Sequence, residues 1–229
     1  MINDQPVFKV SSAWKAEYPN AHAGILVMRG AANPSEHPEL QAQKEALEAH
    51  LRVQYAGNDR ASISALPNIE AYNTYYRRFN KSYHVQLQLE SIVLKGKNLP
   101  RVAALVEAMF MAEIKNLLLT AGHDLDMLQL PITLDVASGE DSYTLLRGEE
   151  QATKSGDMMM VDRAGVVSSI LYGPDQRTQI QPETRNVLFA VYAPRGISPE
   201  AVAQHLENIA QNVLIISPQA TVEMLRVFG

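Results

Sequence analysis

The residues whose types suggest chemistry concentrate in one stretch of the chain, from Tyr76 to Asp126. Its first half is rich in basic residues, with Glu90 as the only acidic residue among them: Arg77, Arg78, Lys81, Lys95, Lys97 and Arg101. Because the whole chain has a formal net charge of -5, this local excess of positive charge predicts a surface for an anionic partner. The alternative is an ordinary solvated helix face with mobile lysines.

A second candidate for chemistry is the dipeptide His123-Asp124, near the end of the same stretch. A histidine titrates near neutral pH, so it can move a proton or donate a hydrogen bond to a carbonyl. Asp124 can orient a neighbouring group or bind a substrate ammonium, and Asp175 can read a hydroxyl or an ammonium. The structural alternatives are a loop or helix-end histidine and two aspartates that stabilise turns.

Further polar residues belong to the same candidate site. Asn80, Lys81 and Ser82 lie in a predicted turn and can line the mouth of a pocket, although Ser82 also fits the N-cap of the next helix. Glu90 either faces a pocket or balances the basic side chains around it. The pair Arg177-Thr178 can bind phosphate or hold the site in place, with a surface ion pair as the alternative.

Several function classes are disfavoured by what the sequence lacks. The chain has no cysteine, which excludes disulfides, thiol catalysis and thiolate metal sites. The phosphate-cradling, dinucleotide-binding and nucleophile-elbow motifs are absent. The six histidines include no H-x-x-x-H pair, so we expect no metal and no cofactor. The N-terminus has no secretory pattern and no apolar run approaches about 18 residues, so we expect a cytoplasmic protein without a membrane partner.

Helical periodicity is strongest in the first half of the chain. Apolar residues recur at helical spacing in a helix of about 18 residues that ends near Gly57, in an aromatic helix over 69–79, and in the segment 85–93. A long apolar stripe after Pro100 predicts a central buried helix, on which Glu107 and Glu113 are expected to be solvated. Lys44 and Glu48 are likewise placed on the polar side of their helix. A last helix begins at Ser198.

Strand patterns dominate the second half. Residues 132–136 and 142–146 flank a turn signal at Ser138–Asp141 and predict a hairpin, and residues 158–161 and 165–172 predict another. Further strands are expected at 7–14, 24–29, 187–192 and 221–227. Because helices come early and strands cluster late, the predicted fold class is α+β, with mixed β-sheets packed against helices.

Four short patterns, in a characteristic order, resemble a known family. They are Ser82 with Glu90-Ser91 and the run Leu94–Pro100, then Leu105-Val106-Glu107, then Asp124-Leu125-Asp126, and finally Gly156–Asp162 with Tyr172-Gly173, Arg177-Thr178 and Thr184. Together they are similar to a free-standing version of the B3/B4 domain of the phenylalanyl-tRNA synthetase beta subunit. The likeness runs from about residue 69 to residue 193. We therefore expect residues 1–229 to form a single domain, with strand and helix extensions packed on this core.

The resemblance implies binding of tRNA and hydrolysis of mischarged aminoacyl-tRNA in trans, with His123 and Asp175 as catalytic candidates. The family's helix carries asparagines where this chain has Ala103-Ala104 and Met109-Phe110. The position that matches the synthetase's site histidine lies near Ala121, two residues before His123. The alternative function is a non-catalytic module that retains the fold and binds a small amino-acid-like ligand or a protein.

Overall fold

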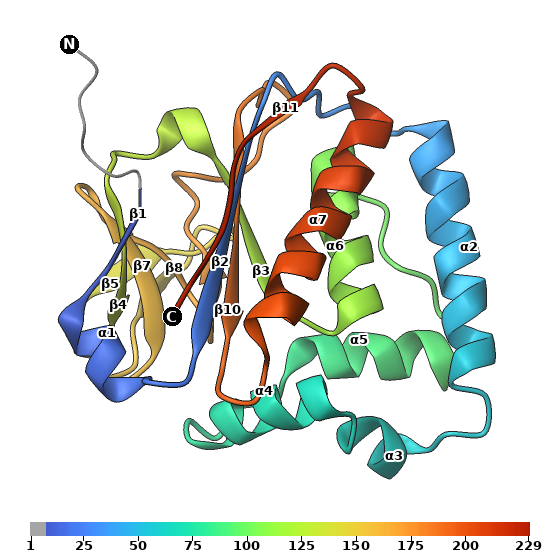
Figure 1. Cartoon of the computed structure of the whole chain (residues 1–229), viewed down its shortest axis with the longest axis horizontal. Coiled ribbons are helices and arrows are strands. Elements are labelled where there is room, and N and C mark those ends of the chain that lie inside the picture. The colour runs from blue at the N-terminus through green and yellow to red at the C-terminus, as the bar shows by residue number, and fades with distance from the viewer. Residues whose placement is uncertain (1–7) are drawn as a thin grey trace.

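The structure is a computed structural model that describes residues 8–229 (Figure 1). The expected strand at 7–14 begins at Val7, which lies outside the described residues, as do the N-terminal residues used to judge a secretory signal. The helices are α1 (Ser12–Glu17), α2 (Pro38–Gln54), α3 (Arg60–Ser64), α4 (Pro67–Arg77), α5 (His84–Val93), α6 (Ala104–Asn116), the short 3-10 helix η1 (Leu125–Met127) and α7 (Pro199–Ile216). The strands are β1 (Phe8–Val10), β2 (His22–Arg29), β3 (Thr120–Asp124), β4 (Ile132–Val136), β5 (Ser142–Thr144), β6 (Glu150–Ala152), β7 (Met158–Asp162), β8 (Gly165–Ser169), β9 (Gly173–Pro174), β10 (Val187–Ala193) and β11 (Thr221–Phe228).

The strands form two larger sheets and one small one. The first sheet has the order β1-β4-β7-β8-β9, in which β1 and β4 are parallel and the other pairs antiparallel. The second has the antiparallel order β11-β2-β10-β3, and β5 pairs with β6. Figure 1 shows the second sheet between the first sheet on one side and helices α6 and α7 on the other. The predicted α+β class with mixed sheets is therefore confirmed.

The central strands and α7 explain why this core is tight. Every residue of β10 is buried, as expected for a strand covered on both faces, and its sequence is apolar throughout. Helix α7 approaches β2 so closely that a Cβ on Gly24 would lie 2.5 Å from Val202 Cγ1. A continuous cluster of buried apolar side chains connects both larger sheets with α2 and with α4–α7.

Most predicted elements are present near the expected positions. The predicted aromatic helix is α4, and its aromatic stripe belongs to the core, with Tyr72, Tyr75 and Tyr76 buried. Helix α5 and strands β2, β10 and β11 also match, and β7 and β8 form the predicted antiparallel pair. The hydroxyl of Ser198 caps α7 by accepting from the Ala201 amide.

Several local predictions were wrong. The helix expected from Pro100 begins at Ala104 and ends at Asn116, because Leu117 turns into a left-handed conformation with φ +59. Ser82 is not an N-cap, since α5 starts after Tyr83 without a side-chain cap. Trp14 belongs to α1 rather than to a strand, because the Ser11 hydroxyl caps that helix by accepting from the Trp14 amide at 3.0 Å.

The predicted pairing of two strand segments also failed. Segments 132–136 and 142–146 do not pair with each other: β4 lies between β1 and β7, and β5 pairs with β6. Each segment finds its pairing partner elsewhere in the chain, so the local turn signal at Ser138–Asp141 was misleading.

The charged residues expected in solvent on α2 and α6 are buried. Lys44 Nζ lies 2.6 Å from Glu107 Oε1, and both side chains are almost fully covered. Glu48 accepts a hydrogen bond from the Leu99 amide at 2.7 Å. Glu113 is 2% exposed. These helices pack against each other and against the loop before α6, so each buried charge or carboxyl finds its partner on another element.

Candidate functional site

A cavity of about 570 Å³ opens between α6, β3 and the segment that joins β8 to β9. Its volume lies within the range of about 300–1,000 Å³ typical of small-molecule sites, which are mostly apolar with a few convergent polar groups. The apolar wall comprises Val102, Ala103, Val106, Met109, Phe110, Leu119, Ala121, Leu146, Ile170, Leu171, Pro174 and Ile180. The cavity is therefore built to receive an apolar group.

A glycine in β3 keeps this cavity open. A Cβ at Gly122 would lie 2.9 Å from Ile180 Cδ1 and 3.2 Å from Met109 Sδ, on two different walls of the cavity. Any side chain here would displace both neighbours or occupy the space between them. The glycine at position 122 is thus explained by the close approach of packed side chains.

Glu113 is the acidic group of the cavity wall. It lies on the buried face of α6, and its Oε1 accepts a hydrogen bond from the Thr120 amide at 2.7 Å. Burial raises the pKa of Glu113 to about 8, more strongly than the Thr120 amide lowers it. The carboxyl is therefore largely protonated at neutral pH, and a neutral carboxyl can donate a hydrogen bond to a ligand.

Thr120 supplies a second polar group, and its hydroxyl is held from behind by His205. The Asn116 amide nitrogen lies 3.0 Å from His205 Nδ1, and His205 Nε2 lies 2.7 Å from Thr120 Oγ1. Because an amide nitrogen only donates, Nδ1 accepts and Nε2 carries the proton that is donated to Thr120. Burial lowers the pKa of His205 to about 3, so the imidazole is neutral. The Thr120 hydroxyl proton is then free to point into the cavity.

The catalytic candidates His123 and Asp175 lie close together, but neither side chain lines the cavity. His123 is fully buried, and its Nδ1 lies 2.8 Å from Thr178 Oγ1. The Thr178 hydroxyl donates to Asp175, whose Oδ1 also accepts from the Thr178 amide at 3.1 Å. Burial lowers the pKa of His123 to about 3 and raises that of Asp175. The three residues form a buried polar chain behind the cavity wall.

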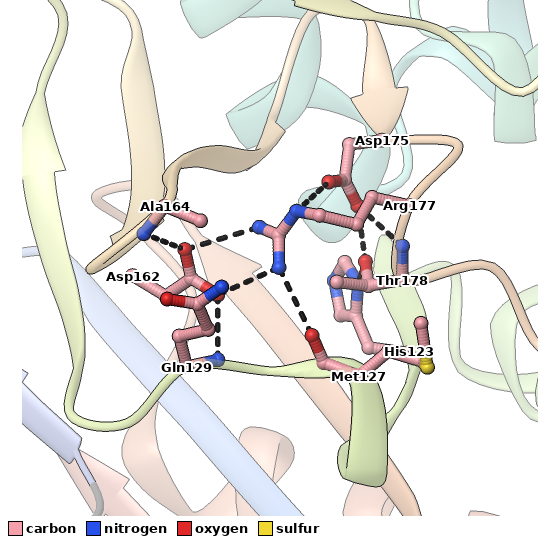
Figure 2. Close-up of polar contacts among 8 residues, drawn as sticks. All are labelled: His123, Met127, Gln129, Asp162, Ala164, Asp175, Arg177 and Thr178. Atoms are coloured by element: carbon pink, nitrogen blue, oxygen red, sulfur yellow. Dashed lines mark hydrogen bonds and ion pairs between the residues drawn. The ribbon is translucent and has the colours of Figure 1, made fainter.

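Arg177 fastens this chain to the neighbouring sheet, as Figure 2 shows. Its two terminal nitrogens each lie 3.0 Å from a carboxylate oxygen of Asp162, a bidentate arrangement. Its Nε lies 3.3 Å from Asp175 Oδ2, and a terminal nitrogen also donates to the Met127 carbonyl at 3.0 Å. The neighbours of this segment, residues 174, 179 and 180, line the cavity, so Arg177 and Thr178 hold a cavity wall in place.

The remaining predicted substrate-binding residues lie apart from the cavity. Asp124 is nearly buried, accepts from the Asp126 amide at 3.0 Å and from the Thr184 hydroxyl at 2.5 Å, and thereby caps η1. Glu90 is buried on α5, where it accepts from Gln86 at 2.8 Å. Neither Asp124 nor Glu90 lines the cavity.

The loop after α4 contains the other three predicted residues. Asn80 is exposed and has a left-handed backbone with φ +55. Lys81 and Ser82 line a separate small hollow of about 220 Å³. We call this space the cationic hollow, and its lining residues are Arg60, Ser64, Asn73, Arg77, Lys81, Ser82, Tyr83, Gln86 and Leu87.

The predicted basic surface divides into separate parts. Arg77 lines the cationic hollow. Arg78 pairs with Glu17 at 2.9 Å. Lys95 and Lys97 are exposed in the loop after α5. Arg101 lines a third space, of about 610 Å³, which we call the second cavity. The basic residues therefore do not form one group of neighbouring side chains.

Sequence reasoning missed Glu113, Thr120 and His205 as polar groups of the site. A signal was present for two of them. Glu113 falls on the apolar stripe of its helix, four residues after Met109, and His205 falls on the stripe of α7, three residues after Val202. A polar residue within an apolar stripe must find a buried partner. Nothing in the sequence singled out Thr120.

Within residues 8–229, no three His, Cys, Asp or Glu side chains are grouped so that they can hold a metal ion. The described part of the chain also contains no helix with the length and apolar character needed to cross a membrane.

Comparisons with known proteins agree with this architecture. The sequence model of the B3/4 domain matches residues 70–217. A solved N-terminal fragment of the phenylalanyl-tRNA synthetase beta subunit from Pyrococcus horikoshii has a similar fold, with a TM-score of 0.51 at 11% sequence identity. The likeness covers 97% of this chain and 54% of that chain, so this protein spans about half the length of the fragment. No curated protein matches the sequence. The predicted resemblance is thus confirmed by a family match over more than half of the residues: the chain belongs to the B3/4 domain family.

Proposed function

We propose that this protein binds the aminoacylated 3′ end of a tRNA and hydrolyses the ester of a wrongly attached amino acid, acting in trans. The observation that carries the proposal is the 570 Å³ cavity, an apolar chamber with Glu113 and Thr120 on its wall. Membership of the B3/4 domain family and the likeness to a fragment of a tRNA synthetase subunit support it. We also propose that the chain acts as one domain, because a single apolar cluster connects its sheets and helices.

The cavity wall suggests how a substrate is recognised. The apolar surface receives the amino-acid side chain, while the neutral carboxyl of Glu113 donates to a carbonyl or hydroxyl oxygen. An isolated charge in this cavity would be costly, since little polar surface surrounds it. The preferred amino acids are therefore those with uncharged side chains.

Ester hydrolysis needs a held water molecule and donors for the negative charge that develops on the carbonyl oxygen. The Thr120 hydroxyl, oriented by His205, and the protonated Glu113 are the two donors on the cavity wall. An aminoacyl ester is reactive, so positioning can supply much of the rate without a strong base. His123 is a positioning residue in this scheme, because it acts through Thr178 and Asp175 rather than on the substrate.

A second candidate function is favoured by one specific observation. The predicted catalytic pair, His123 and Asp175, is buried outside the cavity. A domain that keeps the cavity but lacks a general base would bind an uncharged amino-acid-like ligand without turning it over.

The experiment that separates these functions measures deacylation of a panel of mischarged tRNAs. Wild type is compared with Glu113→Met and Thr120→Val, which remove the cavity donors, and with Glu140→Met, a change at an exposed turn residue, as the matched control. We expect turnover of one or two species that carry uncharged amino acids. The loss of one preorganised donor should reduce the rate about 100-fold, while the control retains wild-type activity.

Binding measurements complete the test. If non-hydrolysable aminoacyl-adenosine analogues bind but no charged tRNA is deacylated, the second candidate function is supported. If neither these analogues nor tRNA bind to the folded protein, the proposed function is refuted.

A further inference from the structure

The cationic hollow has a composition suited to an anion. Three cationic side chains, Arg60, Arg77 and Lys81, line a space of about 220 Å³ between α3, α4 and the start of α5. None of its lining residues is acidic, and the other members include the hydroxyl side chains of Ser64 and Ser82, which can donate hydrogen bonds. A small space with several donors and an excess of positive charge is typical of a phosphate site.

The positive charge of the hollow is only partly compensated. Arg60 Nε lies 3.3 Å from Glu90 Oε1, beside the hollow. Arg77 is held by neutral oxygens, with its Nε donating to the Asn73 carbonyl at 3.2 Å and a terminal nitrogen donating to Thr74 Oγ1 at 3.1 Å. Within the described residues, no carboxylate forms an ion pair with Arg77 or Lys81. One acid against three cations leaves a net positive site.

The hollow adjoins the cavity of the proposed function. Lys81 Nζ lies 5.1 Å from the ring centroid of Tyr172, and that tyrosine lines the cavity. Tyr83 lines the hollow, while its chain neighbour His84 lines the cavity. A ligand that places one group in the cavity can therefore reach the hollow with an adjoining group.

The second cavity is the competing place for such a group, since it shares Val102 and Ala103 with the first cavity. Its lining carries no excess of positive charge. Arg101 is its only Lys or Arg, and its lining also includes Glu36 and Glu107. A phosphate is therefore better stabilised in the cationic hollow.

We propose that the cationic hollow binds the phosphate on the 5′ side of the terminal nucleotide, while the amino acid attached to that nucleotide occupies the cavity. This inference rests on the proposed function and names the second contact through which the substrate is held. Arg60, Arg77 and Lys81 are its ligands, and Lys81 connects the two spaces through its contact with Tyr172.

The test uses a non-hydrolysable 3′-aminoacylamino-adenosine, with and without a 5′-phosphate, in calorimetric titrations. In wild type, the phosphate should tighten binding about 10-fold, the gain expected from charge-assisted hydrogen bonds. In Arg77→Gln/Lys81→Gln, that gain should disappear, while the unphosphorylated compound still binds. Lys9→Gln/Arg226→Gln, which changes two exposed cationic residues on β1 and β11, is the charge-matched control and should keep the full gain.

Salt dependence gives a second readout with tRNA itself. Each cation that contacts a single-stranded phosphate contributes about 0.7 to the slope of log affinity against log salt concentration. The double variant should therefore reduce the magnitude of this slope by up to about 1.4, and the control should leave the slope unchanged. Both substituted residues are exposed, and an unchanged unfolding midpoint will verify that the variant remains folded.

The outcomes distinguish this inference from the proposed function. If the nucleoside compound binds but its 5′-phosphate adds nothing, or adds the same in the double variant, the inference is overturned and the proposed function stands. If neither compound binds, the proposed function fails. In that case a titration with inorganic phosphate tests the anion site by itself. If the hollow binds an anion, the backbone amide NMR signals of Ser82 and Gln86 should shift in wild type, and these shifts should be absent in the double variant.

Discussion

The carboxyl of Glu113 makes the stability of this protein depend on pH in a defined direction. Its pKa rises from 4.5 to about 8 on folding, chiefly because the side chain is buried. Between these values the unfolded chain has lost the proton and the folded chain has kept it, so stability falls as pH rises. Each pH unit within this window costs the folded state about 1.4 kcal/mol, so the full penalty is about 5 kcal/mol.

The substitution Glu113→Gln isolates this penalty. Glutamine has the same shape, keeps an oxygen that accepts from the Thr120 amide, and does not ionise. The free energy of unfolding of the variant, relative to wild type, should therefore increase by about 4 kcal/mol between pH 5 and pH 8.5. Contributions from other titrating groups are common to both proteins and cancel in this difference.

The assay is urea unfolding of both proteins at several pH values across this range. Glu140→Gln serves as the control, because it makes the same substitution at an exposed residue in a turn, away from the cavity. A difference between Glu113→Gln and wild type that does not vary with pH would refute the reasoning. Such a result would mean that the ionised form of Glu113 is as stable in the folded protein as in the solvent-exposed unfolded chain.

Three further substitutions test the packing and charge arguments. Gly122→Val should fill the cavity near Ile180, cost about 1–3 kcal/mol of stability and abolish analogue binding; retained affinity in titrations would contradict the assigned site. Lys44→Met should destabilise the fold by about 3–5 kcal/mol, because it leaves the charge of Glu107 buried without a partner; unfolding curves that match wild type would oppose this. His123→Asn should weaken the loss of stability on acidification. The neutral imidazole, with a pKa of about 3, must gain a proton on unfolding below its ordinary value near 6.5, so an unchanged acid transition would argue against its burial.

Part of the fold could be predicted because its cause is local. The aromatic spacing of α4 places Tyr72, Tyr75 and Tyr76 on one face wherever that helix lies in the fold. Ser198 begins α7 because its hydroxyl can satisfy a free amide of the first turn without any distant partner. The apolar run of β10 likewise indicates a strand covered on both faces.

The candidate site was predicted less well, because burial depends on what packs against a residue. His123 was considered for its chemistry, but Thr178, which holds its ring, is far along the chain. Glu113 was expected in solvent, although β3 and the segment around Ile180 enclose it in the cavity. The sequence shows the charge of Arg177, but its bidentate pairing with Asp162 depends on how the segment after β9 meets the end of β7.

The sequence by itself determined the α+β class, the family resemblance, the positions of most helices and strands, and the absence of cysteine chemistry. Those properties follow from composition, motif order and periodicities of two and 3.6 residues, which act over a few neighbouring positions. Only the tertiary structure decided which strands pair, which carboxyl groups are buried away from solvent, and that the cavity is lined by Glu113 and Thr120 rather than by His123. These depend on contacts between segments far apart in the chain, whose geometry no local pattern contains.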